Sequence, residues 1–180
     1  MAWKREPLEE TELDELLTAA ERHSLRHEMT CRTLAYTGLR ANEFAHMTEE
    51  WVDWQNEQIR VPPEQSGWTP KTAHAVRTIP VREPAALRTL RDYFKRHEKI
   101  GVSRQAITKR VKAVAADTEL RKKVTPHVLR HTYGTLIAAR GATPQYIRQT
   151  MGHADLSSAN AYIQFTGSQL NEEANVIWKV

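Results

Sequence analysis

A strand-like segment interrupts a chain whose other periodic segments are helical. Residues 51–80 combine short β-branched and aromatic runs, Trp51-Val52-Asp53-Trp54, Ile59-Arg60-Val61 and Ala75-Val76-Arg77-Thr78-Ile79, with a polar turn and a Pro/Gly loop. Such runs, bounded by turn residues, are typical of strands in an antiparallel meander. We therefore expect a mainly α-helical α+β fold with a small three-stranded antiparallel β-sheet.

Helix-start and helix-stop residues divide the rest of the chain. Thr11, with Asp14 at the N3 position, predicts a capping box for a helix that runs to about residue 22. A second helix, from about residue 25, is expected to stop at Gly38, and Arg40 then opens a short third one. Further helix starts are expected at Pro84, Ser103, Thr125-Pro126 and Thr143-Pro144, and a last short helix carries Tyr162.

The length of 180 residues suits one domain. We expect residues 1–180 to form a single domain with a core at about 10–165 and a tail at 168–180. The tail carries Leu170, Val176, Ile177 and Trp178, which are too apolar for a free end. It is expected to dock on a neighbouring protomer or back on its own domain.

Positive charge is concentrated in one part of the chain. Residues 88–130 hold thirteen lysines and arginines against four acidic residues, although the whole chain has a net charge of only +4. This concentration favours a polyphosphate partner, because each neutralised phosphate releases condensed counterions. On the helix that follows Ser103, four basic side chains are expected to face outward toward DNA: Arg104, Lys109, Arg110 and Lys112. A solvated helical face is the alternative.

Several classes of protein are excluded or disfavoured. No apolar run approaches the roughly 20 residues that cross a bilayer, and the N-terminus lacks an apolar signal segment. Cys31 is the only cysteine, so an intrachain disulfide and a cysteine-based zinc site are excluded. Two histidine pairs at i, i+4 have no third ligand at motif spacing, so we expect no metal and no cofactor. A cytoplasmic protein without a membrane partner is the simplest interpretation.

Six residues together can attack a phosphodiester without a metal. Such a site needs fixed cations against the charge of the transition state, and Arg40 and Arg130 are the candidates. Tyr162 is the candidate nucleophile, because a covalent ester would store the energy of the broken bond. Lys71 can protonate the departing 5′ oxygen. His127 can take the tyrosine proton or bind a phosphate oxygen, and His153 can donate to a non-bridging oxygen.

Each of these residues has a plainer explanation when taken alone. Tyr162 could pack a helix, Lys71 could be a solvated loop lysine, and Arg40 could form a surface ion pair with Glu43 at i, i+3. His131 is expected to buttress the site or to pack, not to react. The occurrence of all six residues in one ordered set favours the catalytic interpretation.

The ordered set resembles the catalytic domain of the tyrosine recombinases, or phage integrase family. Thr37-Gly38-Leu39-Arg40-Ala41-Asn42-Glu43 is similar to the family's first arginine box, which makes Arg40 catalytic and Glu43 a supporting acid. Pro70-Lys71-Thr72 resembles the hairpin lysine region. His127-Val128-Leu129-Arg130 resembles the His-x-x-Arg box, Met151-Gly152-His153 the Leu-Gly-His step, and Tyr162 lies at the nucleophile's usual distance. Asn42 and Phe44 depart from the usual small residue and leucine.

The resemblance implies a tyrosine recombinase catalytic-domain fold and site-specific DNA recombination or integration through a 3′-phosphotyrosyl intermediate. The implied partners are double-stranded DNA and other protomers, four on two DNA sites when active, with a monomer expected when free. The expected location is DNA-associated, on the nucleoid. Family members usually carry an N-terminal core-binding domain, which we expect to be absent here. Type IB topoisomerase-like relaxation and a non-catalytic DNA-binding module of the same fold remain alternatives.

Overall fold

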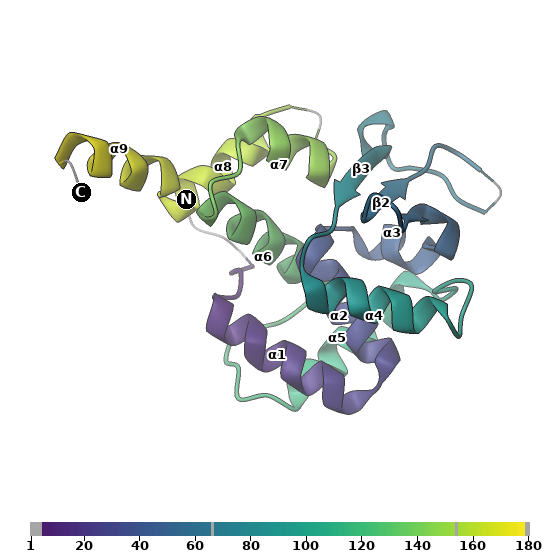
Figure 1. The fold of residues 1–180 in the computed structure, drawn as a ribbon. Coiled ribbons are helices and arrows are strands. Elements are labelled where there is room, and N and C mark those ends of the chain that lie inside the picture. The colour runs from purple at the N-terminus through teal and green to yellow at the C-terminus, as the bar shows by residue number, and fades with distance from the viewer. Residues whose placement is uncertain (1–4, 66, 154, 179–180) are drawn as a thin grey trace.

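The computed structural model describes residues 5–65, 67–153 and 155–178. The described part is mainly helical with one small antiparallel sheet, which confirms the predicted fold class (Figure 1). The helices in chain order are α1 (Glu10–His23), α2 (Leu25–Thr37), α3 (Ala41–His46), α4 (Pro84–Phe94), α5 (Arg104–Ala116), α6 (Pro126–Ala139), α7 (Pro144–Met151), α8 (Ser157–Thr166) and α9 (Ser168–Trp178). The strands are β1 (Val52–Asp53), β2 (Gln58–Val61) and β3 (Arg77–Pro80), with single 3-10 turns at Glu49–Trp51 and Ala73–Ala75.

The predicted helix caps are confirmed at most positions. The side chains of Ser103, Thr125 and Thr143 each accept a backbone N–H of the first turn, and Gly38 ends α2 in the left-handed conformation. The predicted capping box at Thr11 and Asp14 is wrong. The helix begins earlier, at Glu10, and the backbone N–H of Glu9 donates to the Glu12 carboxylate at 2.9 Å. Glu9 and Glu12 offer the same spacing two residues upstream, so the pattern alone did not fix the start.

The sheet is the predicted meander, with β2 between β1 and β3. Ile59 on β2 pairs with Val52 on β1 and with Ile79 on β3. All three side chains are buried, because residues opposite one another in the register face the same side. Trp51 and Trp68 pack edge to face with ring centroids 5.3 Å apart.

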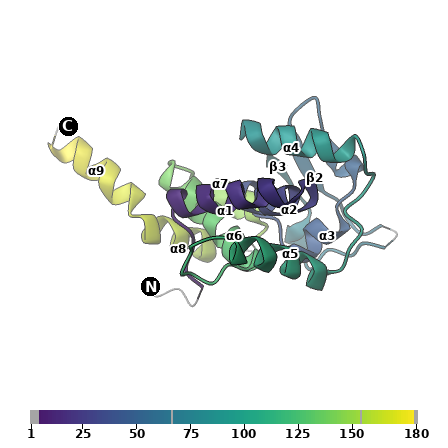
Figure 2. The ribbon, with the colours of Figure 1, turned by 90° about the horizontal axis from the view of Figure 1, so that it is seen from below.

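Helix α2 forms the centre of the molecule. It packs against α1, α4, α5 and α6, and Figure 2 shows α4 and α5 on opposite sides of α1 and α2. Most of its residues are therefore buried, including Arg32, whose Nε donates to Glu28 at 2.9 Å. Burial of a charged side chain is tolerated when it is paired in this way.

A second, smaller apolar cluster holds the C-terminal helices together. It is formed by α6, α7 and α8 through Tyr133, Ala138, Ile147, Met151, Ala159, Tyr162 and Ile163. Beyond it, α9 extends away from the rest of the molecule (Figure 1). Leu170, Val176, Ile177 and Trp178 are all exposed, so these four side chains do not pack on their own domain in this structure, and docking of the tail stays a prediction. None of the helices in the described ranges is long and apolar enough to cross a membrane.

Candidate active site

Arg40 lies where α2 passes into α3. Gly38 adopts φ +67°, and a Cβ atom there would collide with the ring of Tyr133, so the turn requires glycine. Arg40 then caps α3, and its backbone N–H donates to Oε1 of Glu43 at 2.7 Å. The side chain of Arg40 is 26% exposed, and Nη1 of its guanidinium lies 3.5 Å from Oε2 of Glu43. The turn thus leaves this guanidinium available to a ligand.

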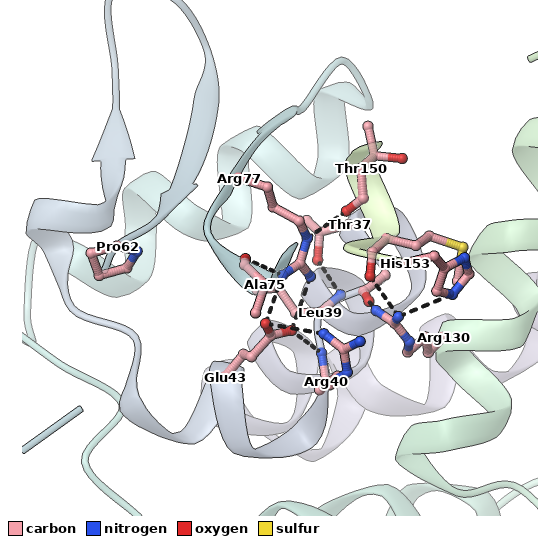
Figure 3. A network of polar contacts seen from close by, with 12 residues as sticks. Thr37, Leu39, Arg40, Glu43, Pro62, Ala75, Arg77, Arg130, Thr150 and His153 are labelled. Atoms are coloured by element: carbon pink, nitrogen blue, oxygen red, sulfur yellow. Dashed lines mark hydrogen bonds and ion pairs between the residues drawn. The ribbon is translucent and has the colours of Figure 1, made fainter. Parts of the chain in front are cut away.

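Glu43 is held by a second arginine, Arg77 at the start of β3. The Arg77 guanidinium binds both carboxylate oxygens of Glu43, at 2.6 and 2.9 Å, and both side chains are almost fully buried (Figure 3). Burial alone would raise the pKa of Glu43, but the hydrogen bonds and charge of Arg77, aided by Arg40, hold the pKa below its usual range. Glu43 is therefore a buried carboxylate that contacts both the backbone and the guanidinium of Arg40, and its supporting role in the reaction stays a prediction.

Arg130 is directed by α6 toward two backbone carbonyls. It donates to the oxygens of Gly38 and Met151, the latter at 2.6 Å, and its Nη2 lies 3.4 Å from Nε2 of His153. Burial, followed by the charges of Arg40 and Arg77, lowers the pKa of Arg130 to about 9. The group stays charged at neutral pH, so two guanidinium cations lie near one another before any anion is bound.

His153 follows the left-handed turn at Gly152, which ends α7. Burial and the charges of Arg130, Arg40 and Arg77 lower the pKa of His153 to about 4. The ring is therefore neutral at pH 7, and an Nε2 atom that accepts from Arg130 leaves the proton on Nδ1. This Nδ1 atom is buried and has no hydrogen-bond partner among the described residues, so a phosphate oxygen could accept from it only after the ring becomes exposed to the cleft.

Tyr162 lies apart from the exposed cations. The side chain is 4% exposed, and its hydroxyl lies 2.7 Å from Nδ1 of His131. Its ring packs directly on α6 at Gly134, where a Cβ atom would come within 2.6 Å of the ring. Burial raises the pKa of Tyr162 to about 12, against the opposing charge of Arg130. Burial, with the charges of His127 and Arg130, lowers the pKa of His131 to about 4, so a neutral imidazole faces a neutral phenol.

An open cleft of about 1100 Å³ gathers most of the candidate residues. Arg40, Lys71, His127 and Arg130 line it from three separate segments of the chain, since His127 and Arg130 share α6, and Lys71 and His127 are exposed. Arg5 also lines the cleft. No motif in the sequence singles it out, since Lys4 and Arg5 are two basic residues ahead of an acidic segment. Neither Tyr162 nor His153 is part of the cleft wall in this structure.

The basic residues of α5 divide into two groups. Arg104 lines the cleft, beside Gln105 and Thr108, and Lys109 and Lys112 are exposed. The prediction that Arg110 faces outward is wrong, because its side chain is half-buried and donates to Oγ1 of Thr30 on α2. The reason is helical phase. Arg110 comes three residues after Ile107 and four before Val114, so it lies beside the buried stripe.

No group of three or more His, Cys, Asp or Glu side chains is placed to bind a metal ion in the part of the chain that the structure describes. The cleft wall carries guanidinium, ammonium and imidazole groups, and its carboxylate, Glu43, is already bound by Arg77. This donor set suits an anion.

The phage integrase family model matches residues 6–168, which include all six candidate catalytic residues. The chain belongs to the phage integrase family. This confirms the resemblance inferred from the motifs. Curated relatives include the tyrosine recombinases XerD of Listeria monocytogenes serotype 4b, 33% identical over 79 residues, and of Staphylococcus saprophyticus, 35% identical over 74 residues. These matches cover 44% and 41% of this chain, and only 27% and 25% of the relatives.

Solved structures of the same family share the fold. The XerA recombinase is 26% identical, with a TM-score of 0.77 over 96% of this chain and 65% of that chain. The XerH site-specific recombinase bound to a palindromic difH substrate has a TM-score of 0.74 and 19% identity, over 97% of this chain and 54% of that chain. The phage integrase fold is thus shown over almost the whole length, while the chain spans less than two thirds of either structure.

Arg77 is the buried residue that the motif analysis did not assign to the site. It lies six residues after Lys71 in the same hairpin, and only its packing against Glu43 and α7 reveals it. Its sequence signal was an arginine in the middle of the predicted strand Ala75-Val76-Arg77-Thr78-Ile79, a position at which many exposed strands carry a charged residue.

Proposed function

We propose that this chain is the catalytic domain of a site-specific DNA recombinase or integrase, which cuts and rejoins one DNA strand through a 3′-phosphotyrosyl intermediate. One observation carries the proposal. A single cleft is lined by Arg40, Lys71, His127 and Arg130, which come from three separate segments, and His153 lies against Arg130. Membership of the phage integrase family supports the same reaction.

In the proposed reaction, Arg40 and Arg130 bind the non-bridging oxygens of the scissile phosphate. Their fixed charges stabilise the pentacoordinate transition state, which gathers more negative charge than the ground state. His153 donates to the same group of oxygens through Nδ1. The two guanidinium groups take the place that metal ions hold in other phosphoryl-transfer sites.

Tyr162 supplies the nucleophile. Its hydroxyl oxygen forms a bond to phosphorus while the bond to the 5′ oxygen breaks, and Lys71 gives that oxygen a proton. The tyrosine proton passes to a neutral imidazole. One candidate acceptor is His131, whose Nδ1 lies 2.7 Å from the tyrosine hydroxyl, and His127 offers a second imidazole in the cleft wall. Attack by a second 5′ hydroxyl on the phosphotyrosine reverses the step, so the reaction consumes no external energy.

The buried position of Tyr162 requires a movement before attack. At 4% exposure its hydroxyl has no room for a phosphodiester, whereas the cations line an open cleft. We infer that α8 shifts when DNA is bound, which brings Tyr162 to a phosphate of its own or of a neighbouring active site.

Double-stranded DNA and further protomers are the partners we propose. Solved relatives include the XerH recombinase bound to difH substrate and a lambda integrase dimer bound to a COC' core site. For this chain we propose four protomers on two duplexes during recombination, and a DNA-associated, nucleoid location. The supporting features are the cleft and the exposed basic residues of α5.

The test is a covalent selection. The protein is incubated with nicked suicide duplexes of randomised sequence, and denaturing conditions isolate duplexes that stay bound. We expect recovery of a defined sequence by the wild type and none by Tyr162→Phe, which lacks only the hydroxyl. DNA binding without any adduct would contradict the enzymatic proposal and favour a non-catalytic module. Adducts that only relax supercoiled DNA, without exchanging strands between duplexes, would indicate topoisomerase-like activity.

A further inference from the structure

The Arg77 side chain joins three segments of the site. It donates from Nη1 and Nη2 to the two carboxylate oxygens of Glu43, and from Nε to the backbone oxygen of Thr150 at 2.7 Å. A further bond from Nη1 reaches the oxygen of Ala75, also at 2.7 Å (Figure 3). Only 4% of the side chain is exposed. One guanidinium therefore binds α3, the end of α7 and the turn before β3.

The first consequence concerns Arg40. Glu43 accepts the backbone N–H of Arg40 and faces its guanidinium, so the carboxylate sets where Arg40 lies. Arg77 contacts both oxygens of that carboxylate in the two-bond geometry that a planar guanidinium provides. The orientation of Arg40 thus depends on Arg77 through Glu43.

The second consequence concerns His153. Thr150, whose oxygen accepts from Arg77, stands three residues before His153 and next to Met151, whose oxygen accepts from Arg130. At Gly152 between them, a Cβ atom would lie 3.2 Å from both Cδ and Nη1 of Arg77. The turn that presents His153 is therefore packed directly on the Arg77 side chain.

We propose that Arg77 is a positioning residue that sets the phosphate-binding groups Arg40 and His153 in register with each other. The inference rests on the proposed strand-cleavage function. Although Arg77 shares a hairpin with Lys71, its bonds lead to the phosphate-binding side of the site. It is therefore expected to act on transition-state binding and not on protonation of the leaving 5′ oxygen.

The decisive variant is Arg77→Lys, because lysine keeps the charge but cannot form the two-bond pair and reach Thr150 together. Arg32→Lys is the matched control. Arg32 is also a buried arginine, 11% exposed and paired with Glu28 at 2.9 Å, but it lies on α2 away from the cleft. Both variants should lose thermal stability. Only Arg77→Lys should slow adduct formation, and DNA affinity should stay unchanged. The expected loss is about 10- to 100-fold, the range found when residues that orient the ligands of metal sites are replaced.

A substrate with a sulfur leaving group distinguishes a defect in protonation of the leaving group from a defect in phosphate binding. The duplex recovered by the covalent selection is prepared with sulfur in place of the bridging 5′ oxygen, a leaving group that needs no proton. We expect this substrate to restore adduct formation by Lys71→Ala and not by Arg77→Lys. Restoration of Arg77→Lys would overturn the proposal, because it would show that Arg77 acts through the hairpin lysine. A slowing equal to that of Arg32→Lys would also overturn it, because it would reduce Arg77 to a stabilising role.

A measurement on the free protein keeps this test independent of the proposed function. The ring of His153 is titrated by NMR, with its signals assigned by comparison with a His153→Gln protein. If Arg77 packs the turn, Arg77→Lys should raise the pKa of His153 from about 4 toward the ordinary 6.5, while Arg32→Lys leaves it unchanged. An unchanged value in Arg77→Lys would contradict the positioning role. Absence of any adduct with the wild type would instead refute the recombinase proposal.

Discussion

The hydroxyl of Tyr162 and the Nδ1 atom of His131 are already paired at 2.7 Å without DNA. Both groups are neutral at pH 7, since burial raises the pKa of the phenol to about 12 and lowers the pKa of the imidazole to about 4. A neutral imidazole beside the phenol is the arrangement that proton removal requires. The same burial that protects the nucleophile therefore keeps its partner neutral at pH values at which an exposed histidine is already protonated.

Acidification should destabilise the fold through His131 and His153. Each has a pKa of about 4 in the folded protein, below the ordinary 6.5. The unfolded chain therefore binds more protons in this window. The free energy of unfolding should fall as the pH drops from 6.5 toward 4, and this contribution should level off below 4. Urea unfolding across this range should show a flatter pH dependence for His131→Gln/His153→Gln than for the wild type. His74→Gln, a change at an exposed position, is the control, and identical slopes in all three proteins would contradict the prediction.

The site shows which residues a sequence can identify. Arg40, His127 and Arg130 were predictable because each lies in a short motif whose spacing is fixed by one helix or turn. The pair of Glu43 and Arg77 joins residues 34 positions apart, and it forms only when the hairpin packs on α3. Arg110 was misplaced for a different reason, because a residue at the edge of a buried stripe can face either way until its neighbours are placed.

At the scale of the element, α8 packs closely on α6 because Gly134 of α6 has no side chain. The ring of Tyr162 lies on the backbone at Gly134, where a Cβ atom would meet ring carbons at 2.6 to 2.8 Å. Gly134→Ala should therefore displace Tyr162 and loosen α8, with a loss of about 1–3 kcal/mol in the free energy of unfolding, as for an overpacked core. Hydrogen exchange of the α8 amides should increase.

Gly167→Ala is the matched control for this change. Gly167 ends α8 and adopts φ +65°, and no described atom lies within 4 Å of the Cβ that alanine would add there. Its substitution strains the backbone without pushing on Tyr162, so the α8 amides before it should keep their protection. Equal exchange in both variants would show that α8 is loosened by backbone strain and not by the contact with Gly134.

Helix α5 should contribute to DNA binding through one face only. Arg104 lines the cleft, whereas Arg110 binds Thr30 on α2. Arg104→Gln should weaken binding to a random-sequence duplex and reduce the slope of log K against log salt by about one, as expected for one lost phosphate contact. Arg110→Gln should leave the slope unchanged. A reduced slope in Arg110→Gln would show that the helix presents the face that its sequence first suggested.

At the scale of the whole molecule, the site lies between two apolar clusters. Arg40 and Lys71 belong to the part built on the large cluster around α2, whereas Tyr162 belongs to the small cluster of α6, α7 and α8. A cluster with fewer buried residues opens at a lower free energy than the main core. The sequence predicted each helix of both clusters, but their separation depends on contacts between distant helices, which no local pattern records. This division allows α8 to move while Arg40 and Lys71 stay fixed.

Helix α9 exposes an apolar surface for contacts with other protomers. Leu170, Val176, Ile177 and Trp178 of α9 are 72%, 79%, 68% and 78% exposed, so they contribute almost nothing to the stability of their own domain. Exposed apolar side chains gathered on one element are typical of a protein interface. We therefore expect that a chain ending at Gly167 unfolds with nearly the same free energy as the full chain, but no longer assembles with other protomers on DNA.

Sedimentation velocity with the selected duplex tests the assembly, and urea unfolding tests the stability. Ile177→Ser/Trp178→Ser should reproduce the loss of assembly without shortening the chain, whereas Glu173→Gln, at an exposed polar position of the same helix, should assemble normally. A large loss of stability in the shortened chain would mean that α9 packs on its own domain in solution. Retained assembly would exclude the apolar face of α9 as the contact between protomers. Loss of assembly with full stability would show that the same short helix that follows the nucleophile also joins one active site to the next.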